Sequence, residues 1–256
     1  MIEACKSSGQ LATYNLWSFW QGLGEVNQQK IIQYFEEHPS MWDYNTLFEG
    51  SGNTSHDHGP IQCLTLLLVI KNLGIADYFF EQFFKYTKRN YNQNSDWGRN
   101  WMAEKNRKIE LYEKLKQHRT NESEIEELNE SQHYYASIDI EDIYWTDTHF
   151  FIMEYSKIVY QKFLNGECLI DRFYKAYLLI FNGREAIYSS LKKQSLSGVQ
   201  CHIFEQYLIY LEKAKEYKKC IEDSKILINS GFTNDFKKRL VRVESKLHKS
   251  SKGNFS

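Results

Sequence analysis

The chain has 256 residues and a formal net charge of −1 at pH 7, so its overall charge favours neither nucleic acid nor an acidic partner. This length is enough to bury a core in one large or two small domains. Only 2 residues are proline and 16% are aromatic, which suits helices with large packing side chains. The five cysteines are widely spaced without a Cys-x-x-Cys pair, which predicts reduced thiols and a cytoplasmic location.

The N-terminal part is expected to be helical. Apolar residues recur at helical spacing over residues 11–38, and two further helices are predicted over residues 61–90. The second of these carries an aromatic band at 78–86, which favours a buried position. The N-terminal residues do not resemble a signal peptide, and the longest apolar run is too short to span a bilayer, so we expect no membrane association.

A loop rich in Gly, Ser and Asn is predicted over residues 49–60. It contains His56, Asp57 and His58, whose imidazole and carboxylate groups are ligands for zinc, iron or manganese. No second cluster follows at a recognisable spacing. A solvated loop is the favoured interpretation, and a metal-dependent hydrolase or nuclease site is the alternative.

Residues 85–119 are basic and partly aromatic, with ten Lys or Arg against four acids. Basic side chains can neutralise phosphates while aromatic rings stack on bases, which would make this stretch a nucleic-acid-binding surface. The residues of this alternative are Lys88, Arg89, Tyr91, Trp97, Arg99 and Trp101. The favoured interpretation is a polar connection at 90–94 followed by an amphipathic helix.

Residues 120–147 contain nine acids and no Lys or Arg. We expect an exposed connection at 122–131, which is the candidate domain boundary, and a short strand or extended loop at 137–145. Two roles for the acids stay open. Asp139, Glu141 and Asp142 are suited to a divalent metal, or the acidic stretch faces the basic stretch before it.

Helices joined by short turns are predicted from residue 148 onward. They cover 148–164, 168–181 and 184–193, and Asn-Gly pairs end the first two. Two further helices follow at about 204–212 and 217–230, with a short polar turn at 213–216 between them. Gly231 stands where a helix C-terminus requires a positive φ, and a last helix follows from Phe236 to Leu247.

Residues 204–247 resemble a tetratricopeptide repeat. The matching positions are Phe204 at the large aromatic position, Tyr207 and Leu211 later in the first helix, Tyr217 at the start of the second, and Cys220 at its small-residue position. Leu208 and Phe232 differ from the residues that the family prefers. The resemblance implies a helical-repeat scaffold of a family that usually binds peptides or proteins. An ordinary helical hairpin in a bundle is the alternative.

We therefore predict an all-α protein of antiparallel helical hairpins, without a cofactor. Its expected parts are an aromatic-rich helical region (1–119), an acidic connection (120–147) and a repeat-like region (148–249). No nucleotide-binding, zinc-protease or serine-hydrolase motif is present, which disfavours an enzyme. The predicted function is a protein-binding adaptor or inhibitor, with nucleic acid as the alternative partner. The partner-binding residues are Phe204, Tyr207, Tyr210 and Tyr217.

The composition also bears on the biological setting. The chain is rich in Lys, Asn, Ile and Tyr and poor in Pro, which is typical of an AT-rich microbial or phage genome. Small helical proteins of such genomes often bind another protein, and phage–host conflict is the setting that we expect.

Overall fold

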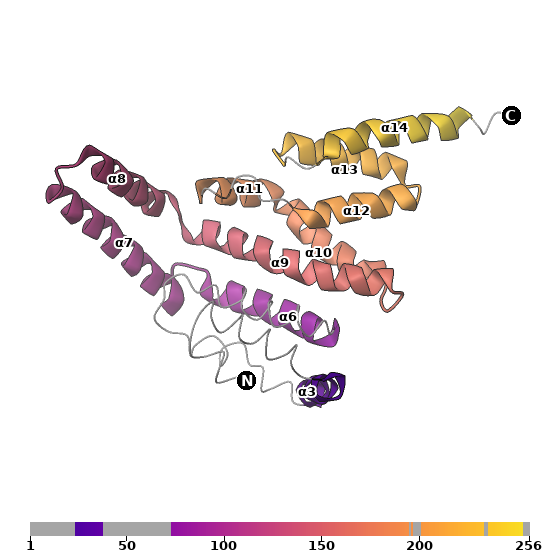
Figure 1. Ribbon diagram of the computed structural model, residues 1–256, viewed down its shortest axis with the longest axis horizontal. Helices are drawn as coiled ribbons and strands as arrows, with labels where there is room; N and C mark the ends of the chain where they lie inside the picture. The colour runs from indigo at the N-terminus through magenta and orange to yellow at the C-terminus, as the bar shows by residue number, and fades with distance from the viewer. Residues whose placement is uncertain (1–23, 38–72, 195, 197–200, 233–234, 253–256) are drawn as a thin grey trace. The chain divides into compact units, whose positions relative to one another are not determined.

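The computed structural model describes residues 24–37, 73–194, 196, 201–232 and 235–252, which contain ten α-helices and no strand (Figure 1). The helices are α3 (Glu25–Glu37), α6 (Leu73–Asn90), α7 (Asp96–Gln117), α8 (Glu122–Ser137), α9 (Ile140–Leu164), α10 (Ile170–Asn182), α11 (Arg184–Lys193), α12 (His202–Lys213), α13 (Tyr217–Asn229) and α14 (Phe236–Lys252). The predicted all-α fold class is confirmed.

The chain divides into two compact units, Met1–Ile158 and Val159–Ser256, and the division falls inside α9. Residues 120–147, the expected acidic connection, lie within the first unit. The stretch 122–131, predicted as a connection, is part of helix α8, which packs against α7. Among the described helices, none combines the length and the apolar character needed to cross a membrane.

The core of the first unit is aromatic and is formed by α6 and by the part of α9 up to Ile158. Phe83 and Phe151 are fully buried and stack with ring centroids 4.1 Å apart. Phe80 packs against Tyr155 at 4.5 Å, and the Tyr155 hydroxyl donates a 2.8 Å hydrogen bond to Oδ1 of Asp77. The predicted buried position of the aromatic band is confirmed for Phe80 and Phe83, since this stripe of α6 faces α9.

Helices α7 and α8 form an antiparallel hairpin (Figure 1). The predicted connection at 90–94 and the amphipathic helix after it are both present. Ser95 caps α7 by accepting a 2.8 Å hydrogen bond from the Gly98 amide. Gly98 is required here, because a Cβ at this position would lie 1.9 Å from the carbonyl oxygen of Asn92.

The prediction of a strand or extended loop at 137–145 is wrong, because α9 begins at Ile140. The Asp139 amide donates to the Asp142 carboxylate at 3.0 Å, and the Asp142 amide donates to that of Asp139 at 2.9 Å. This reciprocal pair satisfies amides that a helix N-terminus leaves without partners. The local capping interaction outweighs the weak alternation of apolar residues that suggested a strand.

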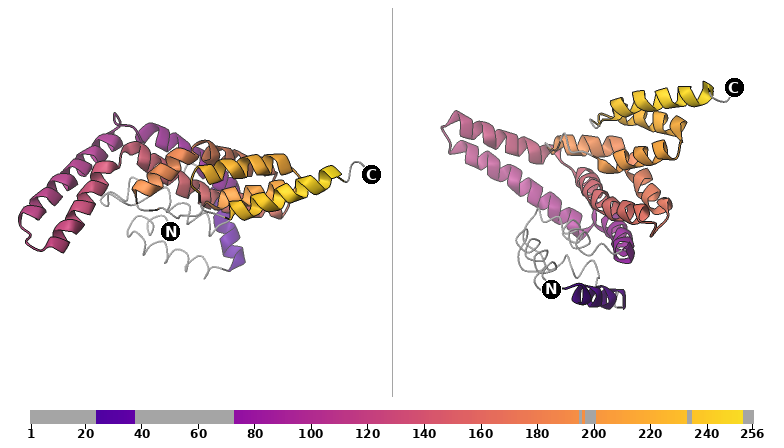
Figure 2. Two further views of the ribbon diagram at one scale, coloured as in Figure 1. Left: turned by 90° about the horizontal axis from the view of Figure 1, so that it is seen from above. Right: turned by 45° about the vertical axis from the view of Figure 1, so that its right-hand side comes forward.

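In the second unit, α13 packs against both α12 and α14, and α10 packs against α11 and α12 (Figure 2). The unit therefore consists of packed helix pairs, as predicted. Three helices end in the same way. The residues at positive φ are Gly166 (76°), Lys215 (64°) and Gly231 (90°), and the next residue's amide bonds back to the carbonyl five residues earlier. The turns predicted at 213–216 and around Gly166 and Gly231 are thus confirmed.

Candidate ligand groove between α12 and α14

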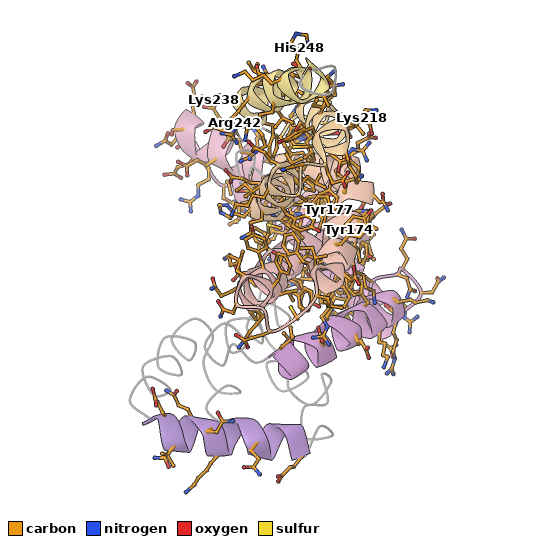
Figure 3. All side chains as sticks on the ribbon, turned by 90° about the vertical axis from the view of Figure 1, so that its right-hand side faces the viewer. Tyr174, Tyr177, Lys218, Lys238, Arg242 and His248 are labelled. Atoms are coloured by element: carbon orange, nitrogen blue, oxygen red, sulfur yellow. The ribbon has the colours of Figure 1, made fainter. Side chains whose placement is uncertain are left out.

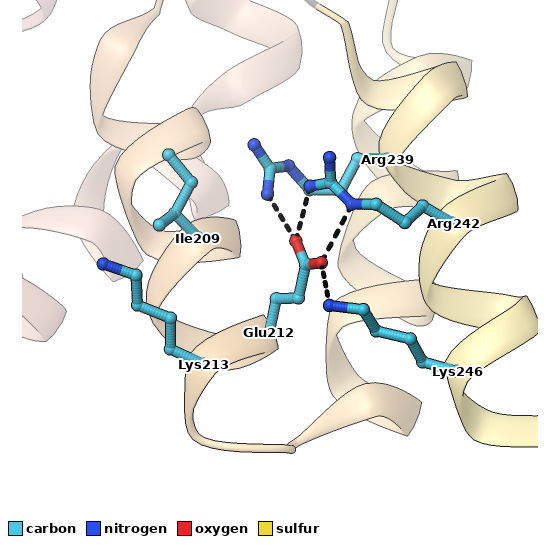
Figure 4. Close-up of a pocket in the computed structure, with 6 residues that line it drawn as sticks. All are labelled: Ile209, Glu212, Lys213, Arg239, Arg242 and Lys246. Carbon is cyan, nitrogen blue, oxygen red and sulfur yellow. Dashed lines mark hydrogen bonds and ion pairs between the residues drawn. The ribbon is translucent and has the colours of Figure 1, made fainter. Parts of the chain in front are cut away.

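A pocket of about 420 Å³ opens between α12 and α14 in the second unit (Figure 4). Its lining residues are Ile209, Glu212, Lys213, Arg239, Arg242 and Lys246. The cations of α14 are spaced i, i+3 and i+7, so they share one face of that helix. The opposite wall comes from the solvent-facing side of α12, whose core side carries Phe204, Leu208 and Leu211.

Glu212 is the centre of the charged network in this pocket. Its Oε2 accepts from Arg239 Nη1 at 2.7 Å and from Arg242 Nη2 at 2.6 Å. Its Oε1 accepts from Arg242 Nε at 2.9 Å and from Lys246 Nζ at 2.8 Å. The Glu212 side chain is only 9% exposed, so these bonds lie in a partly desolvated environment where they are stronger than at an open surface.

The protonation of Glu212 follows from this arrangement. Burial alone would raise the pKa of its carboxyl group, but hydrogen bonds from Arg242 and Lys246 outweigh burial and lower the pKa to about 2. Glu212 is therefore ionised at neutral pH, and it holds three cationic side chains of α14 against α12.

The pocket carries more positive charge than Glu212 neutralises. Its lining contains four cationic side chains and one carboxylate, which leaves a net charge of +3. Arg242 and Lys246 are 54% and 47% exposed, so solvent and ligands reach them. Lys213 lies on α12 and is exposed, and Figure 4 draws no ion pair between it and the other lining residues. The arrangement can accept an anionic group between its walls.

The four predicted partner-binding residues differ in how deeply they are buried. Phe204 is 0% exposed and Tyr207 is 4% exposed, so both belong to the core of the second unit. Tyr207 stacks on Tyr177 at 3.9 Å, and Figure 3 shows Tyr174 and Tyr177 among the helices while Lys238 and His248 extend outward from α14. Tyr210 and Tyr217 are half-buried, so these two have surface to offer a partner.

The residues of the nucleic-acid alternative lie in the first unit. Lys88 and Arg89 are exposed in the last turn of α6. Tyr91 and Trp97 stack on each other at 4.4 Å, and the Tyr91 hydroxyl donates to Asp147. The other two members, Arg99 and Trp101, lie on α7, where Arg99 pairs with Asp96 and the Trp101 ring is 5.5 Å from Lys105 Nζ. The stacked faces of Tyr91 and Trp97 thus already contact each other.

The basic and acidic stretches do face each other in the α7–α8 hairpin, mostly through neutral groups. Arg119 pairs with Glu124 at 3.2 Å, whereas Lys116 donates to Gln132 at 2.7 Å and Lys108 donates to the Tyr135 hydroxyl at 2.9 Å. Lys105 donates to the carbonyl oxygens of Ala136 and Ile138, which end α8. Several cations of this stretch therefore hold the hairpin together.

The proposed metal ligands His56, Asp57 and His58 lie outside the described residues. Of the second acidic set, Asp139 and Asp142 cap α9, and Glu141 accepts from the Trp145 indole at 3.3 Å. Within the ranges that the structure describes, no three His, Cys, Asp or Glu side chains are grouped as a metal ion requires.

The Glu212 network was not predicted from the sequence. The spacing of Arg239, Arg242 and Lys246 is a usable signal, because it places three cations on one helix face. The sequence does not show that Glu212 of another helix lies opposite them. The chain matches no protein-family model, no curated protein and no solved structure with which it was compared.

Proposed function

We propose that this chain is a protein-binding helical scaffold that acts as an adaptor or inhibitor, with no catalysis of its own. The observation that carries this proposal is the accessible, charged pocket between α12 and α14. Helix α12 also carries the half-buried Tyr210, whose ring packs on Phe163 and Tyr207. Interfaces of this kind use Tyr and Arg as anchors, with charged groups that select the partner.

The spacing of the helices supports a repeat architecture of the tetratricopeptide type. Helices α10, α12 and α14 begin at Ile170, His202 and Phe236, so successive starts lie 32 and 34 residues apart. The tetratricopeptide repeat has a period of about 34 residues. In such an array α10 and α12 would be the first helices of successive pairs, and α14 would close the stack. Stacked repeats form extended surfaces suited to protein ligands.

The solvent exposure of the α12 side chains defines the proposed contact surface. Tyr207, Leu208 and Leu211 are buried, whereas Ile209 and Tyr210 are half-buried and Lys213 is exposed. A partner segment lying in the pocket would meet Ile209 and Lys213 of α12 on one side and the cations of α14 on the other. Adaptor or inhibitor activity would come from that contact, and the composition favours a phage or bacterial setting.

Site-specific crosslinking in the native cell tests this function. A photo-reactive phenylalanine analogue replaces Ile209 in the pocket in one variant, and Val241, which is 65% exposed on α14 outside the pocket lining, in the control. We expect one protein to crosslink through position 209 and to survive nuclease treatment. Equal crosslinking from both positions, or loss of the product with nuclease, would contradict the proposal, and the second result would favour the nucleic-acid alternative.

A further inference from the structure

We infer that the groove between α12 and α14 binds an acidic peptide segment, with carboxylate groups that bridge Lys213 on one wall and Arg242 and Lys246 on the other. This inference rests on the proposed function and specifies the chemistry of the partner. Three features of the pocket support it: its net charge, the hydrogen-bond donors that its cations retain, and the residues and volume of its lining.

The charge of the pocket is only partly compensated from within the chain. Glu212 supplies one negative charge to the three cations that contact it, and Lys213 adds a fourth cation to the lining. Two carboxylates of a ligand would lower the net charge of the site from +3 to +1. An uncharged or basic segment would leave the repulsion among the cations in place.

The cations retain hydrogen-bond donors for a ligand. Arg242 uses Nε and Nη2 on Glu212, and a guanidinium has five N–H donors in all, so donors on Nη1 stay available. Lys246 directs one bond to Glu212 and its ammonium carries three N–H donors. Glu212 is a positioning residue in this arrangement, because it fixes Arg242 and Lys246 before the ligand arrives, which reduces the entropy lost on binding.

The lining favours peptide over nucleic acid. Single-stranded nucleic acids bind where aromatic rings stack on successive bases, and none of the six lining residues is aromatic. The apolar contact is the aliphatic Ile209, which in Figure 4 lies on α12 beside Lys213. The pocket volume of about 420 Å³ suits a few side chains of an extended segment.

The test is a selection with displayed random peptides of about twelve residues on the full chain, followed by affinity measurements with the selected peptides. The pocket variant is R242Q/K246Q, in which Arg239 still binds Glu212. The matched control is K218Q/K237Q, which removes two exposed cations outside the pocket lining. A third variant, Lys213→Gln, changes the pocket without breaking a bond to Glu212, and circular dichroism checks that each variant is folded.

We expect the selected peptides to be enriched in Asp and Glu. Their affinity should fall about tenfold in R242Q/K246Q and about threefold in K213Q, and should stay unchanged in K218Q/K237Q. Raising the salt concentration from about 0.05 M to about 0.3 M should weaken binding, since salt screens exposed charges.

Three results would overturn the inference, and they differ in what they say of the proposed function. Selected peptides that are neutral or basic and that bind R242Q/K246Q as well as the unmodified chain would refute the acidic ligand and keep the scaffold function. Failure to select any peptide would count against both. Binding of a labelled single-stranded oligonucleotide of about 20 nucleotides that R242Q/K246Q abolishes, without binding of acidic peptides, would assign the pocket to nucleic acid.

Discussion

The hydroxyl of Tyr177 on α10 donates a 2.8 Å hydrogen bond to Oδ2 of Asp223 on α13. Tyr177 is fully buried and Asp223 is 3% exposed, so this bond lies inside the second unit and joins helices from two different pairs. Burial and the neighbouring carboxylate raise the pKa of the Tyr177 hydroxyl, which therefore stays protonated and keeps donating.

Replacing Tyr177 with Phe should destabilise the second unit by about 1–3 kcal/mol, because a buried carboxylate loses a donor and retains Lys219 at 3.4 Å. The free energy of unfolding from urea titration measures this. Tyr217→Phe is the control, and it should change stability by no more than about 0.5 kcal/mol, since Tyr217 is half-buried at the start of α13. If the free energy of unfolding is the same in Y177F as in the unmodified chain, the hydrogen bond makes no net contribution to stability.

Replacing Glu212 with Gln should cost about 2 kcal/mol at pH 7, because three cations of α14 lose their charged partner on α12. Folding lowers the pKa of Glu212 from the ordinary value of 4.5 to about 2. Its contribution is therefore complete above about pH 5 and declines as the pH falls toward 2.

The measurement is the difference in unfolding free energy between the unmodified chain and Glu212→Gln at several pH values. Comparing the two chains cancels the titration of other carboxyl groups. We expect the difference to be constant from about pH 7 to pH 5 and to shrink below that range. If the difference stays constant down to about pH 2, the stability lost in Glu212→Gln does not come from the negative charge of the carboxylate.

Replacing Lys215 with Gly should stabilise the chain by about 1 kcal/mol, because Lys215 has a φ of 64° that a side chain disfavours. The same replacement at Glu222, in the interior of α13, should destabilise by about 1 kcal/mol, because glycine is a poor helix former. Thermal unfolding of both variants should shift the melting temperature in opposite directions. A loss of stability in Lys215→Gly would mean that the side chain contributes more than the backbone strain costs.

Replacing Gly231 with Ala should lower the free energy of unfolding more than replacing Gly166 with Ala does, although both residues have a positive φ. A Cβ at Gly166 meets nothing within 4 Å, so only backbone strain of about 1 kcal/mol is expected. A Cβ at Gly231 would lie 2.7 Å from the Tyr188 ring, which adds a steric cost of about 1–3 kcal/mol.

A double-mutant cycle separates the two costs at Gly231. In a Tyr188→Ala background, Gly231→Ala should cost about as much as Gly166→Ala does in the unmodified chain, because the ring is gone. Urea unfolding of the four chains gives the coupling energy. A coupling near zero would show that the ring moves aside without loss.

Local patterns in the sequence were enough to predict the helical class and the turns of the second unit. A 3.6-residue period and a helix-ending glycine act within one or two turns of chain, so they are legible without the fold. The prediction at 137–145 was wrong because two weak local signals compete there. The alternation of apolar residues suggested a strand, whereas the Asp139–Asp142 capping pair starts a helix. The positive φ of Lys215 was not legible, because lysine carries no signal for that conformation.

The sequence by itself determined that 204–247 folds as a helical hairpin followed by a third helix, and that α14 carries cations at spacings that share a face. Only the tertiary structure decided that Glu212 lies opposite them, 27 to 34 residues away in the chain. It also decided that Phe204 and Tyr207 face the core while Tyr210 keeps exposed surface. The physical reason is that pairing across helices depends on how α12, α13 and α14 pack, which no local period encodes.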